Sequence, residues 1–280
     1  MTFARRGILT AVAALLGSSL GGCSPAALLN TTVPRKGYRL TADIPYGQGP
    51  RRSLDLYEPE QPRADGKVVL FFYGGSWDSG AKSDYLFVAQ ALAARGFVVV
   101  VPDYRLYPEV RFPAFIEDGA QATRWATDRF GADKLFITGH SAGAEIASML
   151  AANTPYLAQA GVERMKLRGF IGLSGPYDFL PLTSARLIQI FGGANNPEIE
   201  AITFAKAPLP PALLIHGTAD TTVYPRNSEH LAAAWRRAGA EVELKLYPDV
   251  DHVDVVAAFS DLLHGKAPTR DDVLAWIDAH

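Results

Sequence analysis

Short, nearly continuous runs of apolar residues recur along the chain after residue 67. The clearest is Val68-Val69-Leu70-Phe71-Phe72, and similar runs follow at residues 97–101, 134–138, 169–173 and 212–215. Runs of this length are typical of parallel strands that are buried on both faces of a sheet. Polar and apolar residues alternate in three other segments, which predicts half-buried strands at 38–44, 52–57 and 241–247. A Pro/Gly turn joins the first two of these segments, which suit an antiparallel edge.

Helical segments separate these strands. They cover residues 85–95, 113–130, 142–152 and 227–238, and Gly96, Gly131 and Gly239 stand where C-terminal caps are expected. Two more helices, at 253–263 and 270–279, are predicted to close the chain. Strands that alternate with helices indicate an α/β fold, with a mostly parallel central sheet, an antiparallel N-terminal edge and helices on both faces. In such a fold, ligands bind at the carboxyl ends of the strands.

The first 22 residues have the composition of a targeting segment. Arg5 and Arg6 precede an uncharged, apolar or small stretch over residues 7–20, and Leu20-Gly21-Gly22-Cys23 follows. This order predicts a signal peptide, and the apolar run is too short to span a bilayer. The motif around Cys23, the only cysteine, is similar to a bacterial lipobox. Ordinary signal cleavage with an incidental cysteine and an uncleaved anchor are the alternatives, and the Arg pair also resembles a twin-arginine export signal.

The lipobox resemblance implies a division of the chain into three parts. Residues 1–22 would be removed, residues 23–37 would form a lipidated tether that is flexible over 24–34, and residues 38–280 would form the folded domain. The protein would then be exported and would stay attached to a membrane of the bacterial cell envelope. Ser24 stands after Cys23 in place of a retention-type Asp, which favours outer-membrane sorting in an organism with two membranes.

Composition excludes several broad classes of protein. The 280 residues are 48% hydrophobic, which is enough for one large core and unlike a disordered or collagen-like chain. Lys plus Arg number 27 against 29 Asp plus Glu, and no basic run occurs after the first residues, so no nucleic-acid partner is expected. A single cysteine cannot close an intramolecular disulfide, so stability must come from packing.

The sequence around Ser141 has the pattern of a catalytic nucleophile. Gly139-His140-Ser141-Ala142-Gly143 lies between a predicted strand and a predicted helix, which is the context that a G-x-S-x-G elbow requires. Small residues allow a strained turn that exposes the Ser141 hydroxyl above the sheet, close to the N-terminal amides of the next helix. We therefore expect Ser141 to be the nucleophile.

A serine nucleophile needs a base and an acid that orients the base. Among six histidines, His252 alone lies in a loop between the last strand and a helix, whereas His216 ends a strand and is expected to brace a loop. Asp220 follows the preceding strand and can reach His252, which gives the chain order Ser141, Asp220, His252. Asp178 is the rival acid. Asp249 and Asp251 are weak candidates for metal ligands with His252, and no metal or other cofactor is expected.

A tetrahedral intermediate also needs hydrogen-bond donors for its oxyanion. Gly74 and Gly75 follow the first buried strand, where their backbone amides can approach a substrate carbonyl. The amide of Ala142, directly after the nucleophile, is the expected partner.

Together these motifs resemble the α/β-hydrolase fold, and within it the carboxylesterases related to hormone-sensitive lipase and to bacterial feruloyl-esterase-like enzymes. The resemblance covers residues 38–280 and also rests on the segments 103–109, 113–118, 175–178 and 216–220. In that family a His usually precedes the oxyanion glycines, whereas this chain has Tyr73. The resemblance implies that residues 103–106 are structural.

The segment over residues 176–207 is the only candidate for a lid, and the cap is therefore expected to be small or absent. Its apolar residues either line a pocket or pack a short helix onto the sheet, and Trp77 either forms a pocket wall or fills core. Tyr73, Trp77 and Phe179 are the candidate pocket residues.

The sequence thus predicts a serine carboxylesterase that hydrolyses small esters with short acyl or aryl groups through an acyl-enzyme. An arylformamidase, another amidase or a peptidase with the same triad is the alternative, and a non-catalytic binding lipoprotein is a more remote one.

Overall fold

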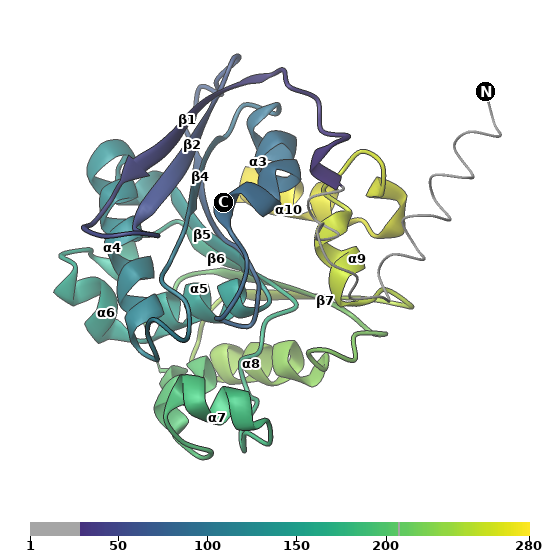
Figure 1. Ribbon diagram of the computed structural model, residues 1–280. Helices are drawn as coiled ribbons and strands as arrows, with labels where there is room; N and C mark the ends of the chain where they lie inside the picture. Colours follow the sequence, from purple (N-terminus) through teal and green to yellow (C-terminus); the bar gives the residue numbers. More distant parts are fainter. Residues whose placement is uncertain (1–28, 207) are drawn as a thin grey trace.

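A twisted sheet of eight strands forms the centre of the molecule in the computed structural model, which describes residues 29–206 and 208–280 (Figure 1). The strands are β1 (Tyr38–Pro45), β2 (Ser53–Pro59), β3 (Val68–Phe72), β4 (Val98–Pro102), β5 (Leu135–His140), β6 (Gly169–Leu173), β7 (Ala212–Gly217) and β8 (Val242–Tyr247). Their spatial order is β1-β2-β4-β3-β5-β6-β7-β8. The pairs β1–β2 and β2–β4 are antiparallel, and every later pair is parallel. This topology confirms the predicted fold class.

Burial explains why the sequences of the central strands are continuous runs of apolar residues. Every residue of β3, β5, β6 and β7 is buried, because helices cover both faces of the sheet there. β1 lies at the edge and most of its residues are exposed, so its sequence alternates.

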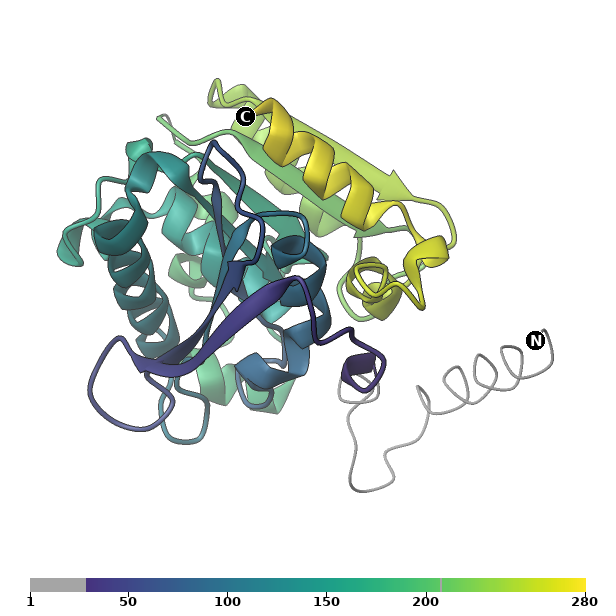
Figure 2. The same cartoon turned by 90° about the horizontal axis from the view of Figure 1, so that it is seen from above.

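The helices form two layers on the sheet. They are α3 (Leu86–Ala93), α4 (Ala114–Phe130), α5 (Ala142–Ala152), α6 (Thr154–Gln159), α7 (Ala185–Phe191), α8 (Arg226–Arg237), α9 (His252–Ala257) and α10 (Thr269–Ala279). α3 and α10 cover one face, and α4, α5 and α8 cover the other, as the two views in Figures 1 and 2 show. No helix within 29–206 or 208–280 is long and apolar enough to cross a membrane.

One predicted helix is shorter than expected. The periodic segment 253–263 forms a helix only to Ala257 and continues as turns. The Ser260 hydroxyl accepts a hydrogen bond from the Leu262 amide at 3.2 Å, a local bond that competes with helical pairing.

The segment before β1 belongs to the folded domain from Leu29 onward. Leu29 and Val33 are buried in the core, with 4% and 8% of their surface exposed. The Asn30 amide nitrogen donates to the carbonyl oxygens of Ser83 and Asp84, and its oxygen accepts from the Phe87 amide. The prediction of a flexible tether up to residue 34 is therefore wrong for residues 29–34, because apolar burial and three long-range hydrogen bonds hold them. Cys23 and the predicted signal peptide lie outside the described residues.

Candidate active site

Ser141 stands at a sharp turn between β5 and α5. Its backbone adopts φ 55° and ψ −124°, a left-handed conformation that is strained for a residue with a side chain. The turn brings α5 so close to β3 that a Cβ atom at Gly143 would lie 2.1 Å from the carbonyl oxygen of Phe72. The Ser141 amide donates to the Leu173 carbonyl of β6 at 2.9 Å. Only glycine fits this crossing, which explains the G-x-S-x-G spacing.

The structure brings Ser141, His252 and Asp220 together from three separate parts of the chain. The Nε2 atom of His252 lies 2.9 Å from the Ser141 hydroxyl, and its Nδ1 atom lies 2.7 Å from Oδ2 of Asp220. Because the Asp220 carboxylate accepts, Nδ1 of His252 carries a proton and Nε2 is free to accept the proton of Ser141. This is the geometry of a nucleophile, a base and an orienting acid.

Asp220 is completely surrounded by donors. Its Oδ1 atom accepts from the amides of Thr222 and Val223 at 2.9 and 2.8 Å. Its Oδ2 atom lies 2.7 Å from His252 and 3.2 Å from Nε2 of His216. Burial by itself would raise the pKa of Asp220, but the hydrogen bonds from His216, His252 and the backbone outweigh it and hold the pKa well below its usual value. The carboxylate therefore stays charged opposite His252.

The other candidate acids are engaged elsewhere. Asp178 pairs with Nδ1 of His230 at the surface and not with His252. Asp251 caps α9, since its Oδ1 atom accepts from the amides of Val253 and Asp254. In the described parts of the chain, no three His, Cys, Asp or Glu side chains lie close enough together to hold a metal ion.

A chain of hydrogen bonds runs behind the three residues. Nε2 of His140 lies 3.1 Å from the His252 carbonyl oxygen, and Nδ1 lies 3.0 Å from the Tyr85 hydroxyl. A carbonyl oxygen only accepts, so His140 carries its proton on Nε2 and accepts from Tyr85 at Nδ1. Burial, with the nearby His252, lowers the pKa of His140 to about 3, so the ring is neutral. No local sequence pattern singles out Tyr85 for this position.

The amide of Gly74 is the next link in this chain, because it donates to the Tyr85 hydroxyl at 3.1 Å. The prediction that Gly74 donates to an oxyanion is therefore wrong for this structure, since its hydrogen is already used. Gly75, which has φ 140°, and Ala142 remain as candidate donors. Neither amide meets an acceptor within residues 29–206 and 208–280, and Ala142 opens α5, where amides have no helical partner.

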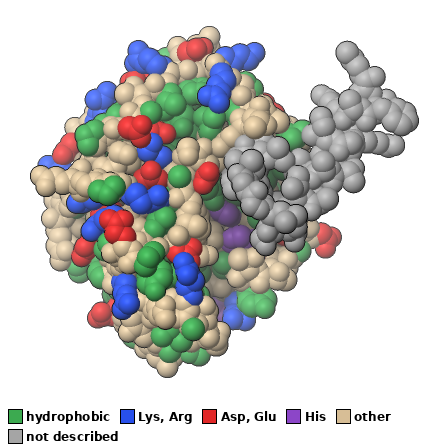
Figure 3. All heavy atoms as spheres, in the orientation of Figure 1, with side chains coloured by type: hydrophobic (Ala, Val, Ile, Leu, Met, Phe, Trp, Pro, Cys, Tyr) green, Lys and Arg blue, Asp and Glu red, His purple; other side chains and the backbone are tan. Residues whose placement is uncertain are grey.

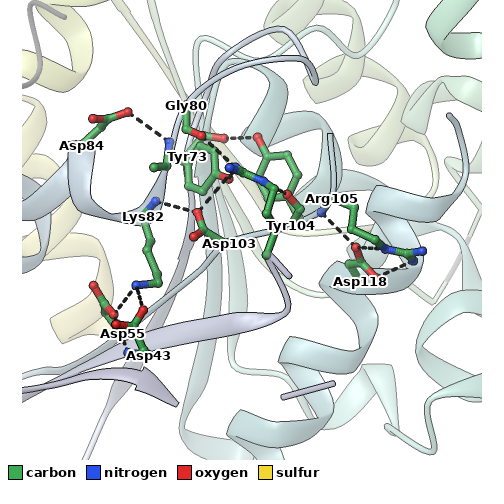
Figure 4. Close-up of polar contacts among 12 residues, drawn as sticks. Asp43, Asp55, Tyr73, Gly80, Lys82, Asp84, Asp103, Tyr104, Arg105 and Asp118 are labelled. Carbon is green, nitrogen blue, oxygen red and sulfur yellow. Dashed lines mark hydrogen bonds and ion pairs between the residues drawn. The ribbon is translucent and has the colours of Figure 1, made fainter. Parts of the chain in front are cut away.

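The loop that carries Gly74 and Gly75 is braced by polar contacts beneath it (Figure 4). Arg51 donates to the Tyr73 hydroxyl at 2.6 Å and to the Gly80 carbonyl at 2.8 Å, and the Tyr104 hydroxyl donates to the Tyr73 carbonyl at 2.8 Å. Tyr73 is completely buried and stacks on Tyr104. The prediction of Tyr73 as a pocket residue is therefore wrong, because its ring is enclosed and holds the loop in place.

Trp77 and Phe179 belong to an aromatic cluster that contains Trp77, Phe112, Phe115, Phe179 and Phe191. Trp77 is only 4% exposed, its ring centre lies 4.8 Å from that of Phe191, and its Nε1 atom donates to Oε2 of Glu145 at 3.0 Å. Neither Trp77 nor Phe179 lines the cavity at Ser141. The prediction of Trp77 as a pocket residue is therefore wrong, because packing encloses its ring, whereas Phe179 is partly buried against the same cluster. The part of this segment that the structure describes, residues 176–206, packs onto α5 and α8 through the turn Ala201–Phe204, in which Ala201 is fully buried.

A cavity of about 410 Å³ opens at Ser141 and His252. Ser141, His252 and the turn Gly74–Ser76 line it, together with apolar side chains from α3, α9 and the N-terminal segment. Histidine side chains are visible near the middle of the face shown in Figure 3. The volume falls within the usual range for small-molecule sites.

The family of the chain follows from a comparison with protein-family models. The model described as BD-FAE matches residues 54–235, which is more than half of the chain and includes Ser141 and Asp220. The chain belongs to the BD-FAE family.

Members of other named groups are similar to this BD-FAE protein. Isoprenylcysteine alpha-carbonyl methylesterase of Arabidopsis thaliana is 29% identical over 263 residues, which are 84% of this chain and 61% of that protein. Kynurenine formamidase of Danio rerio is 24% identical over 230 residues, with 78% of this chain and 76% of that protein covered. The chain spans about three fifths of the length of the methylesterases that it matches.

A solved structure, a hormone-sensitive lipase from a metagenome library, superposes on this BD-FAE protein with a TM-score of 0.75. It covers 98% of both chains at 23% identity. This likeness supports the α/β-hydrolase fold.

Proposed function

We propose that the protein is a serine carboxylesterase that hydrolyses small esters with short acyl or aryl groups. The observation that carries the proposal is the contact of Ser141 with His252 and of His252 with Asp220, beside an open cavity that Ser141 and His252 line. Membership of the BD-FAE family and the methylesterase relatives support ester hydrolysis. A binding protein without activity would not need all three side chains in this geometry.

In the proposed reaction, Nε2 of His252 takes the proton of Ser141 while Oγ bonds to the ester carbonyl carbon. The carbonyl oxygen becomes an oxyanion that accepts hydrogen bonds from the amides of Gly75 and Ala142. When the intermediate collapses, the bond to the alcohol oxygen breaks and His252 gives its proton to that oxygen. Water then attacks the acyl-enzyme by the same steps in reverse, which releases the acid and restores Ser141. Asp220 remains ionised throughout and stabilises the imidazolium.

Amide hydrolysis is the second candidate, and the similarity to kynurenine formamidase favours it. The same three residues would act, and the leaving group would be an amine that takes its proton from His252. The two reactions would therefore use the same residues and differ in the leaving group.

Hydrolysis of p-nitrophenyl acetate, butyrate and octanoate by the purified full-length protein tests the main proposal, with formanilide as the amide substrate. Ser141→Ala should lower the rate at least about 1,000-fold, because it removes a triad member. Ser184→Ala is the matched control, since Ser184 caps α7 at the surface. Ester turnover that Ser141→Ala leaves unchanged would contradict the proposal, and formanilide turnover above that of every ester would favour the second candidate.

We also propose that the protein is an exported lipoprotein attached to a bacterial envelope membrane through Cys23. The order of charged, apolar and Gly-Gly-Cys segments supports this reading. Leu29 is fixed in the core and lies six residues after Cys23, so an extended chain between them reaches at most about 20 Å. A lipid anchor at Cys23 would therefore hold the catalytic domain close to the membrane surface.

Mass spectrometry of the mature protein from membranes tests the anchor. The N-terminal peptide should begin at Cys23 and carry acyl chains, and Cys23→Ser should move the protein out of the membrane fraction. An unmodified Cys23, or cleavage at another residue, would contradict the proposal.

A further inference from the structure

Six of the side chains that line the cavity are aliphatic or phenyl groups. We call this set the apolar wall, and it consists of Leu29, Phe87, Val253, Val256, Ala257 and Leu263. Val253 is partly exposed at the mouth, and the other members are nearly buried. Except for Phe87, they all fall outside residues 54–235, so the match to the BD-FAE family assigns no role to them. They come from the N-terminal segment, from α3, and from α9 and the turns after it.

Asn30 fixes the outer part of this wall. Its side chain bonds to Ser83, Asp84 and the Phe87 amide, with distances of 2.7, 3.1 and 3.2 Å. These contacts hold Asn30 against the start of α3, although the bonded residues are more than fifty positions apart in the sequence. Leu29 is therefore held in the wall by specific bonds as well as by burial.

The acidic residues of the cavity do not make it a site for a cation. The Asp84 carboxylate accepts from the Ala81 amide at 3.0 Å, and Asp254 pairs with Lys266 at 3.3 Å. Both carboxylates thus have partners outside the cavity, and their charge disfavours an anionic ligand. An uncharged group suits the remaining surface.

The position of the wall relative to His252 identifies the part of the ester that it would contact. His252 returns its proton to the leaving oxygen, so the alcohol must lie beside Nε2. Val253, Val256 and Ala257 follow His252 on α9 and line the cavity next to it. We propose that the apolar wall is the subsite for an uncharged, apolar alcohol group of the substrate, an inference that rests on the esterase function proposed above.

Two ester series measured with the purified full-length protein test this subsite. The first series is ethyl, butyl and hexyl acetate, followed by acid release, and the second is the p-nitrophenyl esters of increasing acyl length. Burial of each added methylene raises kcat/KM by at most about fourfold. We expect hexyl acetate to exceed ethyl acetate by at least about tenfold, with no such gain along the acyl series.

Two variants remove parts of the wall by different means. Leu29→Ala deletes apolar contact, and Asn30→Ala releases the segment that holds Leu29. Each should lower the hexyl-to-ethyl ratio of kcat/KM about three- to tenfold, and Leu40→Ala, at an exposed position of β1, should leave the ratio as in the wild type. A ratio within one variant does not depend on how much of the protein is folded, so a loss of stability would not imitate the result.

The possible failures can be told apart. If the protein shows no Ser141-dependent turnover of p-nitrophenyl acetate, the proposed function fails. If p-nitrophenyl acetate is hydrolysed but kcat/KM does not change along the alcohol series, the subsite is wrong. The subsite is also wrong if neither Leu29→Ala nor Asn30→Ala changes the hexyl-to-ethyl ratio. If kcat/KM rises with chain length only in the acyl series, the apolar wall does not bind the alcohol group and the proposal is overturned.

Discussion

Two apolar regions meet at the loop that follows β3, and only one of them leaves space for a ligand. Ser76 and Trp77 are consecutive, and both have positive φ angles of 52° and 60°. Ser76 lines the cavity at Ser141, whereas Trp77 points into the aromatic cluster and bonds to Glu145. The cluster is packed solid with large rings, and the cavity is bounded by smaller side chains from three segments.

The difference teaches that aromatic residues beside a catalytic motif are not by themselves evidence of a pocket. Large rings bury more surface when they pack against each other than when they border a cavity. In this protein the aromatic cluster supports the loop and α5, and the apolar wall is free to receive a ligand. The two regions should therefore respond differently to substitution.

Loss of the Asp220 carboxylate, on the cavity side, should have the largest effect of these changes, and this effect should be on activity. Asp220→Asn leaves the shape of the site unchanged but removes the charge that orients His252, so kcat for p-nitrophenyl acetate should fall about 10,000-fold. Asp178→Asn is the matched control, because Asp178 bonds to His230 at the surface. Comparable losses in the two variants would mean that Asp220 is not the orienting acid.

Truncation in the aromatic cluster should affect stability rather than selectivity. Trp77→Ala removes a ring that contacts Phe115, Phe179 and Phe191, and should lower the free energy of unfolding by about 3–5 kcal/mol. Urea unfolding measures this, with Tyr224→Ala, at an exposed ring, expected within about 0.5 kcal/mol of the wild type. If Trp77→Ala is as stable as the wild type but prefers different substrates, the aromatic cluster lines a substrate pocket and the account of it as packing is wrong.

A pH titration of stability should reveal the buried carboxyl beneath the cluster. Burial raises the pKa of Glu145 well above its usual value, so the folded state keeps a proton that the unfolded state loses above about pH 4.5. Folding therefore becomes less favourable as pH rises. Glu145→Gln removes this dependence, so its stability relative to the wild type should grow as the pH rises above about 4.5, by at most about 1.4 kcal/mol per pH unit. A constant difference across this range would show that Glu145 does not titrate in this way.

The smallest of these effects is expected for Tyr85, which links the glycine loop to His140. Tyr85→Phe removes the hydroxyl that accepts from Gly74 and donates to His140, but it keeps the ring. We expect kcat to fall about tenfold, because small displacements of reacting groups are costly. Tyr57→Phe, at a buried tyrosine of β2, is the control for a structural effect alone. Equal kcat in Tyr85→Phe and the wild type would exclude a positioning role.

The fold and the grouping of Ser141, Asp220 and His252 could be predicted from the sequence because local patterns specify them. Five consecutive apolar residues in β3 require burial on both faces, and a G-x-S-x-G turn between a strand and a helix has few other structures. Strand order brings the ends of β5, β7 and β8 to one edge of the sheet, which places Asp220 and His252 near Ser141.

The parts that were missed depend on contacts between segments far apart in the chain. The partner of the Gly74 amide is Tyr85, and nothing in the turn itself shows that this hydrogen bond forms. The segment around Leu29 is too short to show a periodic pattern, and its burial depends on Asn30 meeting α3. Whether Trp77 and Phe179 line a cavity or fill one is decided by neighbours such as Phe191.

Covalent labelling with a fluorophosphonate tests the central claim most directly, because only an activated serine reacts with it readily. Intact-mass spectrometry of the wild type should show one adduct per chain, and peptide mapping should place it on Ser141. Ser141→Ala should show none, and Asp220→Asn should react far more slowly. An adduct on another residue, or equal labelling of Ser141→Ala, would contradict the account.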